Sequence, residues 1–197
     1  IYASSIGLLY KGEPLAGALY IPWPNKEGHL LISAAKGMGV KLNGEEYTIA
    51  EASKFNSSGI ITLPGSFDKR FEFTKEFKNQ SGELRMGGSI AYELSLLILG
   101  VSQYAVISAS HIWDVAGAIP ILFESGYSVK QASNNSKRPQ WESFDSFKHL
   151  ANNPKYEDYR TRINPILVSS VNQMEYISNN IKIKTPSLST LIKSIIK

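Results

Sequence analysis

Asp114 is the acid of this chain that is best placed to take part in chemistry, because it lies at the start of an apolar run. Residues 115–123 carry no charge, so a helix formed by them should be buried on nearly every face. Ser125 and Gly126 mark its expected end, because Gly readily adopts the left-handed conformation that closes a helix. A carboxylate in the first turn of this helix either caps free backbone N–H groups or presents oxygen to a divalent cation.

A second candidate is the sequence Gly87-Gly88-Ser89, which precedes an apolar helix expected over residues 90–99. Backbone N–H groups at a helix N-terminus point outward and can hold an anion. An ordinary helix cap explains the same pattern. Arg85, just before the loop, either orients it or is a surface residue of a strand. One acid and one glycine-rich loop do not by themselves decide between chemistry and structure.

Four stretches of the chain, in the same order along the sequence, resemble the signatures of the inositol monophosphatase superfamily. Residues 113–118, followed by Ile121, Glu124 and Gly126, are similar to its Trp-Asp motif and its Glu-Ala-Gly-Gly end. Residues 4–8 with 14–20 resemble the family's Ser-Ile-Gly … Gly-Val-Val-Tyr hairpin. Residues 34–40 with 43–44 resemble its Ala-x-x-Gly-x-Gly-Ala … Asn-Gly segment, and residues 85–91 resemble its Arg-x-x-Gly-Ser-Ala-Ala loop. The resemblance covers residues 1–130 and, less clearly, 164–181.

This resemblance implies a Mg²⁺-dependent phosphomonoesterase in which Asp114 is a catalytic residue and a metal ligand. It implies that Gly88, Ser89 and Ile90 contact the alcohol part of the substrate. Because the metal activates water in this family, the resemblance assigns no acid–base role to His111. The family's other metal ligands, a Glu on an early helix and an Asp-Pro-Ile-Asp-Gly-Thr loop, have no counterpart here, since the sequence starts just past where that loop should end.

Two hypotheses about function follow. In the first, the intact protein uses Mg²⁺ to hydrolyse a small phosphate monoester of the inositol, sugar, histidinol or nucleotide type. In the second, the chain is an incomplete fragment or a degenerate member that binds a partner without turnover. Many inositol-selective relatives carry a Glu shortly before the Trp-Asp acid, whereas residues 106–110 hold no acid, which weighs against inositol phosphate. Pro120 is tolerated in relatives that resemble histidinol-phosphate phosphatases.

Composition places the chain among globular proteins of mild positive charge. It has 197 residues, 43% of them hydrophobic and 19% charged, with no Cys and a formal net charge of +4. Because Lys and Arg are scattered and no apolar run is long, we expect neither nucleic acid nor a membrane as partner. The resemblance implies a small phosphorylated metabolite, which the mild positive charge would help to attract. The lack of Cys excludes disulfides and thiolate metal sites and fits a cytoplasmic location. Dimers are common in the family that the chain resembles, so a homodimer is one expected assembly.

The patterning predicts an α/β layered sandwich, with an antiparallel sheet in the first half and a mixed α/β unit in the second. We interpret residues 1–58 as the remainder of an N-terminal antiparallel-sheet domain and residues 59–197 as a C-terminal α/β domain. Asn43-Gly44 predicts a type I′ hairpin turn. The expected strands comprise residues 3–10, 15–22, 29–34, 59–63, 83–86, 103–108, 127–130 and 165–169.

Four further segments carry expectations of their own. The phenylalanines of residues 66–79 have helical spacing, which favours one helix with these side chains in the core rather than a stacking platform. Residues 131–162 are polar and irregular, and we interpret them as an insertion or long loop. A helix is expected over residues 171–181. The basic, amphipathic tail, residues 181–184 and 188–197, either packs its Leu and Ile face on the domain or touches a membrane.

Overall fold

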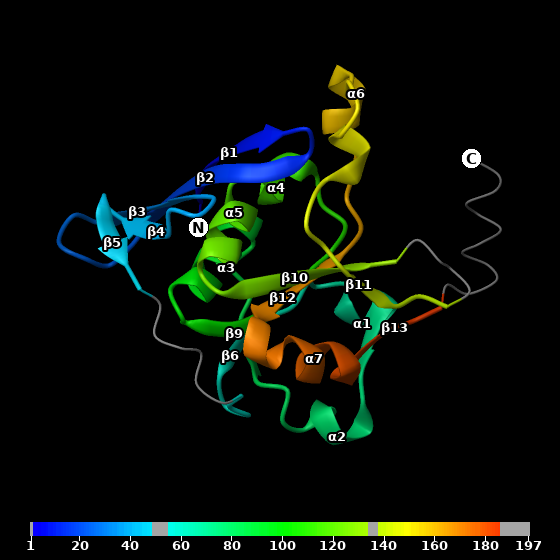
Figure 1. The fold of residues 1–197 in the computed structure, drawn as a ribbon. Coiled ribbons are helices and arrows are strands. Elements are labelled where there is room, and N and C mark those ends of the chain that lie inside the picture. The colour runs from blue at the N-terminus through cyan, green and yellow to red at the C-terminus, as the bar shows by residue number, and fades with distance from the viewer. Residues whose placement is uncertain (1, 49–54, 134–137, 186–197) are drawn as a thin grey trace.

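The computed structural model describes residues 2–48, 55–133 and 138–185, which form two main sheets with helices packed between and beyond them (Figure 1). The first sheet is antiparallel, with five strands in chain order. Two of its turns, Lys11-Gly12 and Asn43-Gly44, have both residues at positive φ, as a type I′ turn requires, so the turn predicted at Asn43-Gly44 is confirmed. Its strands are β1 (Ser4–Tyr10), β2 (Glu13–Pro22), β3 (His29–Ala35), β4 (Val40–Leu42) and β5 (Glu45–Tyr47).

The second sheet is mixed and has the strand order β11-β10-β12-β9-β6-β8. In it β6 runs parallel to β8 and β9, and the other neighbouring strands are antiparallel. An antiparallel sheet followed by a mixed α/β unit confirms the predicted layered α/β sandwich. The strands of this sheet are β6 (Ile60–Thr62), β8 (Glu83–Leu84), β9 (Ser102–Ile107), β10 (Tyr127–Ala132), β11 (Trp141–Ser143) and β12 (Ile166–Ser170).

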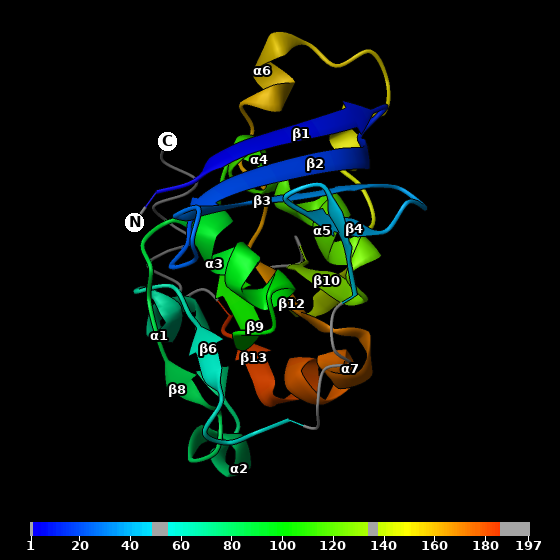
Figure 2. The ribbon, with the colours of Figure 1, turned by 90° about the vertical axis from the view of Figure 1, so that its left-hand side faces the viewer.

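Two helices, α3 (Ile90–Ile98) and α5 (Ala118–Glu124), lie between the sheets. α5 packs on β2 and β3 from one side and on β10 from the other, and α3 packs on β9. From the side, the layers are the first sheet, these helices, the second sheet and α7 (Val171–Asn180) (Figure 2). The main hydrophobic core occupies this middle layer and takes buried residues from both halves of the chain. The division into domains at residue 58 stays a prediction.

The first sheet and the helical layer meet through backbone at three glycines. Gly7 and Gly17 are cross-strand partners in β1 and β2. A Cβ built on Gly7 would lie 2.5 Å from the carbonyl of Ala116, and one on Gly17 would overlap the carbonyl oxygen of Gly117. A Cβ on Gly117 would in turn overlap the hydroxyl of Ser5. Only glycine permits these approaches, so the segment before α5 lies directly on the backbone of the sheet.

Residues 66–79 do not form the single helix that their spacing predicted. Two short helices, α1 (Phe67–Arg70) and α2 (Lys75–Lys78), flank the strand β7 (Phe71–Phe73), which pairs with β13 (Ile181–Ile183). Pairing with a distant segment satisfies the backbone of β7 in extended form and overrides the local helical preference. The prediction of core positions is confirmed, because Phe67, Phe71 and Phe77 are buried in a second hydrophobic cluster.

The described part of residues 131–162 holds more structure than a polar loop. Besides β11 it contains the 3₁₀ helix η1 (Lys148–Leu150) and the helix α6 (Tyr156–Tyr159). The side chains of Phe144, Phe147 and Leu150 are buried in the main core. The backbone N–H of Phe147 donates to the carbonyl of Gly12 in the turn between β1 and β2. The three buried side chains and the hydrogen bond to Gly12 therefore hold this polar segment against the rest of the domain.

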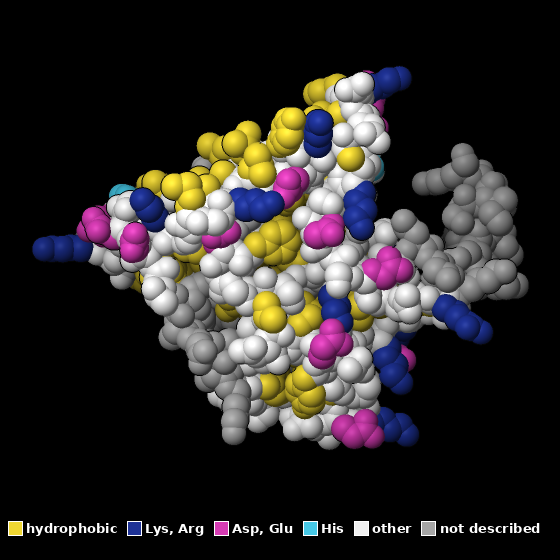
Figure 3. Space-filling model, in the orientation of Figure 1, with side chains coloured by type: hydrophobic (Ala, Val, Ile, Leu, Met, Phe, Trp, Pro, Cys, Tyr) yellow, Lys and Arg dark blue, Asp and Glu magenta, His cyan; other side chains and the backbone are white. Residues whose placement is uncertain are grey.

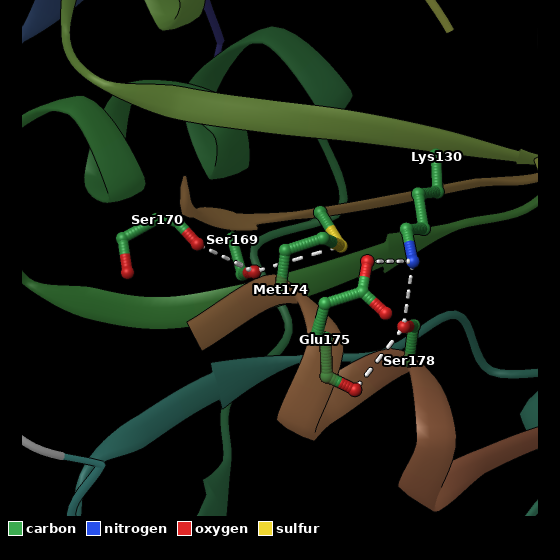
Figure 4. Close-up of polar contacts among 6 residues, drawn as sticks. All are labelled: Lys130, Ser169, Ser170, Met174, Glu175 and Ser178. Atoms are coloured by element: carbon green, nitrogen blue, oxygen red, sulfur yellow. Dashed lines mark hydrogen bonds and ion pairs between the residues drawn. The ribbon is translucent and has the colours of Figure 1, made fainter. Parts of the chain in front are cut away.

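Helix α7, predicted over residues 171–181, is confirmed and covers the outer face of the second sheet. Figure 4 shows Lys130 Nζ of β10 donating to Glu175 Oε1 at 2.6 Å and to Ser178 Oγ at 3.0 Å, both on α7. The next strand, β13, buries Ile181 completely, so this part of the tail packs on the domain. Residues 188–197 lie outside the described residues. In the part of the chain that the structure describes, no helix has the length and apolar character needed to cross a membrane.

One face of the first sheet is apolar and exposed, and it follows the upper left edge of Figure 3. The opposite face is covered by α5. Small residues of β2 and β3 line a hollow of about 400 Å³ on the exposed face. The large exposed apolar side chains of this sheet face are Ile6, Leu8, Tyr10, Tyr20, Leu31 and Met38. Contiguous apolar surfaces of this kind are typical of contacts with another polypeptide.

The glycine contact predicts that Gly17→Ala destabilises the protein. The added methyl group overlaps backbone that cannot move without separating α5 from the sheet, so we expect the free energy of unfolding to fall by about 1–3 kcal/mol. Urea denaturation followed by circular dichroism measures the change. Gly65→Ala is the matched control, since the nearest atom to its Cβ is the flexible end of Met86 at 3.5 Å. Equal stability of the two variants would contradict the prediction.

Candidate active site

Asp114 lies in the short helix α4 (Ile112–Val115), after the loop that leaves β9. Its Oδ2 accepts a hydrogen bond from the backbone N–H of His111 at 2.9 Å, so one carboxylate oxygen holds the start of the helix. The side chain is 33% exposed, which leaves the carboxylate open to solvent. The two interpretations of this acid are therefore compatible, because the same group caps α4 and can meet a ligand.

The helix expected over residues 115–123 is divided into α4 and α5. Between them Ala116 and Gly117 keep helical dihedral angles but lie on the sheet at the glycine contact. Pro120 falls in the first turn of α5, where a backbone N–H has no partner within the helix, so the proline costs no hydrogen bond. Gly126 follows α5 with a φ of 75°, which confirms the predicted left-handed end.

His111 and Trp113 form an aromatic pair next to Asp114. Their rings are stacked, with centroids 4.3 Å apart and an interplanar angle of 7°. His111 Nδ1 lies 4.0 Å from Asp114 Oδ2, which is too long for a hydrogen bond. Trp113 is half exposed. The imidazole therefore packs beside the carboxylate without sharing a proton with it.

The loop Gly87-Gly88 is held by Glu93, a buried acid of α3. Glu93 Oε1 accepts hydrogen bonds from the backbone N–H of Gly87 at 2.8 Å and of Gly88 at 2.9 Å. Gly88 has a φ of 77°, a conformation that favours glycine. Ser89 is the N-cap of α3, but its side chain makes no capping hydrogen bond. The anion at these N–H groups is thus a carboxylate of the protein itself.

Arg85 does not take part in this arrangement. One guanidinium nitrogen donates to the carbonyl of Leu84, and the other lies 2.8 Å from Glu83 Oε2. The side chain is 62% exposed, so the ion pair is a surface contact of small energetic value. Arg85 is therefore a surface residue next to β8, which is the second of its two predicted roles.

A pocket of about 210 Å³ opens beside the glycine loop. Its lining includes Gly88, Ile90 and Glu93 from the loop and α3, and Ile107 and Ser108 from the end of β9 and the loop that follows. Ser108 begins the loop that leads from β9 to Asp114, and α3 packs against α4. The structure therefore brings two of the predicted substrate residues, Gly88 and Ile90, to one pocket at the base of the loop that carries Asp114.

Among the described residues, Asp114 is a candidate for one metal ligand and is not part of a larger group of such side chains. Within residues 2–48, 55–133 and 138–185, no three His, Asp or Glu side chains gather as a metal centre. Mg²⁺ in enzymes is commonly bound by one or two carboxylates together with substrate phosphate and water. The carboxylate of Asp114, one-third exposed, has the chemistry of one such ligand.

Two acids that hold glycine turns were assigned no role by the sequence analysis. Glu93 holds the Gly87-Gly88 loop, and Glu124 at the end of α5 accepts hydrogen bonds from the N–H groups of Gly37 and Gly39, both at 2.8 Å. The sequence pattern could have indicated the role of Glu93, since it is the single charged residue in an apolar helix and follows a glycine pair. The partners of Glu124 are remote in sequence and could not be inferred.

Comparisons with known proteins agree with this architecture. A model of the inositol monophosphatase family matches residues 1–172. A fructose-1,6-bisphosphatase/inositol-1-monophosphatase of Aquifex aeolicus is 27% identical over 131 residues, which are 64% of this chain and 48% of that protein. An inositol monophosphatase of Dictyostelium discoideum is 29% identical over 161 residues, or 78% of this chain and 56% of its own length. Inositol monophosphatase-II from Staphylococcus aureus MSSA476 has a similar structure, with a TM-score of 0.62 and 24% identity over 90% of this chain and 60% of that one.

The chain spans about half the length of these curated relatives. The family match nevertheless extends over most of its residues and includes α4, α5 and the glycine loop. The structural likeness shows the same fold across nine-tenths of the chain. The chain therefore belongs to the inositol monophosphatase family.

Proposed function

We propose that the intact protein hydrolyses a small phosphate monoester with Mg²⁺ and that Asp114 is one ligand of the metal. The observation that carries this proposal is a carboxylate, one-third exposed and fixed at the start of α4, that follows a loop whose first residue, Ser108, lines a pocket. The names of the Aquifex and Dictyostelium relatives support a phosphate monoester as substrate. When bound, the metal would polarise the phosphoryl group and activate water for attack.

The residues of this chain position the reacting parts. The hydrogen bond from the N–H of His111 fixes one oxygen of Asp114, so the other can point toward a cation without reorganisation. Gly88, Ser89 and Ile90 contact the alcohol part of the substrate in this proposal. Glu93 is a positioning residue, because it holds the loop through backbone N–H groups. His111 has no role as an acid or base.

The alternative is a chain that binds without turnover, and one observation favours it: the described residues contain no group of three or more His, Cys, Asp or Glu side chains placed to hold a metal. Phosphate release by the intact protein, assayed on inositol, sugar, histidinol and nucleotide monophosphates with and without Mg²⁺, separates the two functions. Metal-dependent release supports the enzyme. The absence of release from all four classes supports the binding module.

Asp114→Asn should reduce kcat/KM of the intact protein on the order of 100-fold or more and weaken its affinity for Mg²⁺, because a neutral amide is a poor metal ligand. The amide oxygen can still accept the hydrogen bond from His111, so stability should be nearly unchanged. Initial rates over a Mg²⁺ titration measure both effects. Glu124→Gln is the control, since it removes the same charge from a carboxylate that holds a different loop. Unchanged turnover and unchanged metal affinity in Asp114→Asn would refute the proposed ligand.

Glu93→Ala should lower the free energy of unfolding by about 1–3 kcal/mol, because two backbone N–H groups lose their acceptor. Since the substrate loop then loses its fixed conformation, we expect KM to rise more than kcat falls. Glu93→Gln keeps an acceptor oxygen and should recover most of both losses. A Glu93→Gln variant as impaired as Glu93→Ala would show that the acceptor is not what matters. Denaturation midpoints and steady-state kinetics on the same preparations provide the comparison.

A further inference from the structure

The segment before β12 lies alongside the loop that leads from β9 to Asp114. β9 and β12 are antiparallel neighbours, so the loop that leaves one and the segment that enters the other are at the same end of the second sheet. Within these two segments, His111 and Arg162 form an isolated antiparallel bridge. The backbone N–H of Ile163 donates to the carbonyl of Ser110 at 2.8 Å. The backbone therefore holds Arg162 next to His111, the N-cap of the helix that carries Asp114.

The bridge also sets the direction in which the side chain of Arg162 leaves the backbone. Directly opposite residues of an antiparallel pair project to the same side, with Cβ atoms about 4.5–5.5 Å apart. Arg162 therefore starts on the same side as the imidazole of His111. That ring stacks on Trp113, and its Nδ1 lies 4.0 Å from Asp114 Oδ2. From this position a long, flexible arginine side chain can reach an anion bound beside the carboxylate.

The guanidinium of Arg162 has no counter-ion among the residues that the structure describes. Arg162 is exposed and lines a polar pocket of about 520 Å³, yet it makes no ion pair with Glu142 or Asp145, which line the same pocket. Arg160, by contrast, donates to the hydroxyl of Tyr156 at 3.2 Å and lies over its ring. The guanidinium of Arg162 is thus available to an external anion, which it can hold through two parallel hydrogen bonds.

We propose that Arg162 binds the phosphoryl group of the ligand that Asp114 holds through its metal. This inference rests on the proposed function. A phosphate monoester carries roughly −1.5 to −2 charge at neutral pH, so the carboxylate of Asp114 repels it when no cation is present. A guanidinium stays charged at any ordinary pH and matches two phosphoryl oxygens at once. Arg162 is then an anion-binding residue that comes from outside the loop of Asp114.

Binding of inorganic phosphate to the intact protein, measured by calorimetric titration without Mg²⁺, tests this assignment apart from turnover. Arg162→Gln should weaken the affinity about tenfold or more, because charge-assisted hydrogen bonds are lost. Since the side chain makes no polar contact with the described residues, the variant should keep its stability. Arg162→Lys keeps the charge without the planar fork and should recover part of the loss.

Arg160→Gln is the matched control for this titration. It removes the same charge from a side chain that already has a partner, so its affinity for phosphate should equal that of the wild type. Absence of phosphate binding by the wild type, or equal affinities in the wild type and Arg162→Gln, would overturn the inference.

A second substitution tests whether the bound anion lies beside Asp114. Without Mg²⁺, Asp114→Asn removes a repelling charge, so the affinity for phosphate should rise by roughly threefold or more. The same substitution in an Arg162→Gln background should give little gain, because the anion is no longer held there. Glu124→Gln should leave the affinity as it is, since its carboxylate holds the turn at Gly37 and Gly39. Unchanged affinity in Asp114→Asn would place the anion of Arg162 elsewhere and contradict the inference.

Kinetics distinguish this inference from the proposed function. If the intact protein hydrolyses a phosphate monoester with Mg²⁺, Arg162→Gln should raise KM by about tenfold and change kcat less, as the loss of a binding contact does. An unchanged KM would refute the inference while the phosphatase stands. Phosphate binding that depends on Arg162, in a protein that hydrolyses no monoester, would support the inference and refute the phosphatase.

Discussion

The close contact between three glycines is the constraint on which the arrangement of this molecule depends. Gly7 and Gly17 expose the backbone of β1 and β2, and Gly117 lies against it. Because no side chain separates the two layers there, the break between α4 and α5 is fixed relative to the sheet. Asp114 precedes this break by two residues, so the position of its carboxylate follows from the contact. The apolar core then fills the space on either side.

At two glycine turns, carboxylates of the protein itself accept the backbone N–H groups. Glu93 accepts the N–H groups of Gly87 and Gly88, and Glu124 accepts those of Gly37 and Gly39. Each pair of charge-assisted hydrogen bonds orders a turn that glycine alone would leave flexible. Both acids are therefore committed to structure. Asp114 differs because it is one-third exposed and its hydrogen bond engages a single oxygen.

The site combines a charged part and an apolar part that the loop from Ser108 to His111 joins. At one end Asp114 meets solvent beside the stacked rings of His111 and Trp113. At the other end, the pocket near Gly88 is lined by aliphatic side chains, by glycine backbone and by Glu93 and Ser108. A phosphate monoester has the same division, with a charged phosphoryl group and an alcohol of variable polarity.

Features that depend on local backbone sterics were predictable from the sequence. Asn43-Gly44 formed its type I′ turn, α3 ended before Gly100, and Gly126 closed α5, because backbone sterics at glycine and asparagine need no distant partner. Only the tertiary structure decided the rest. Residues 71–73 became a strand because Ile181–Ile183 offered hydrogen bonds from more than a hundred residues away. Glu124 gained its role from the turn at Gly37 and Gly39, more than eighty residues away in the sequence. Long-range pairing and packing of this kind leave no local pattern in the sequence.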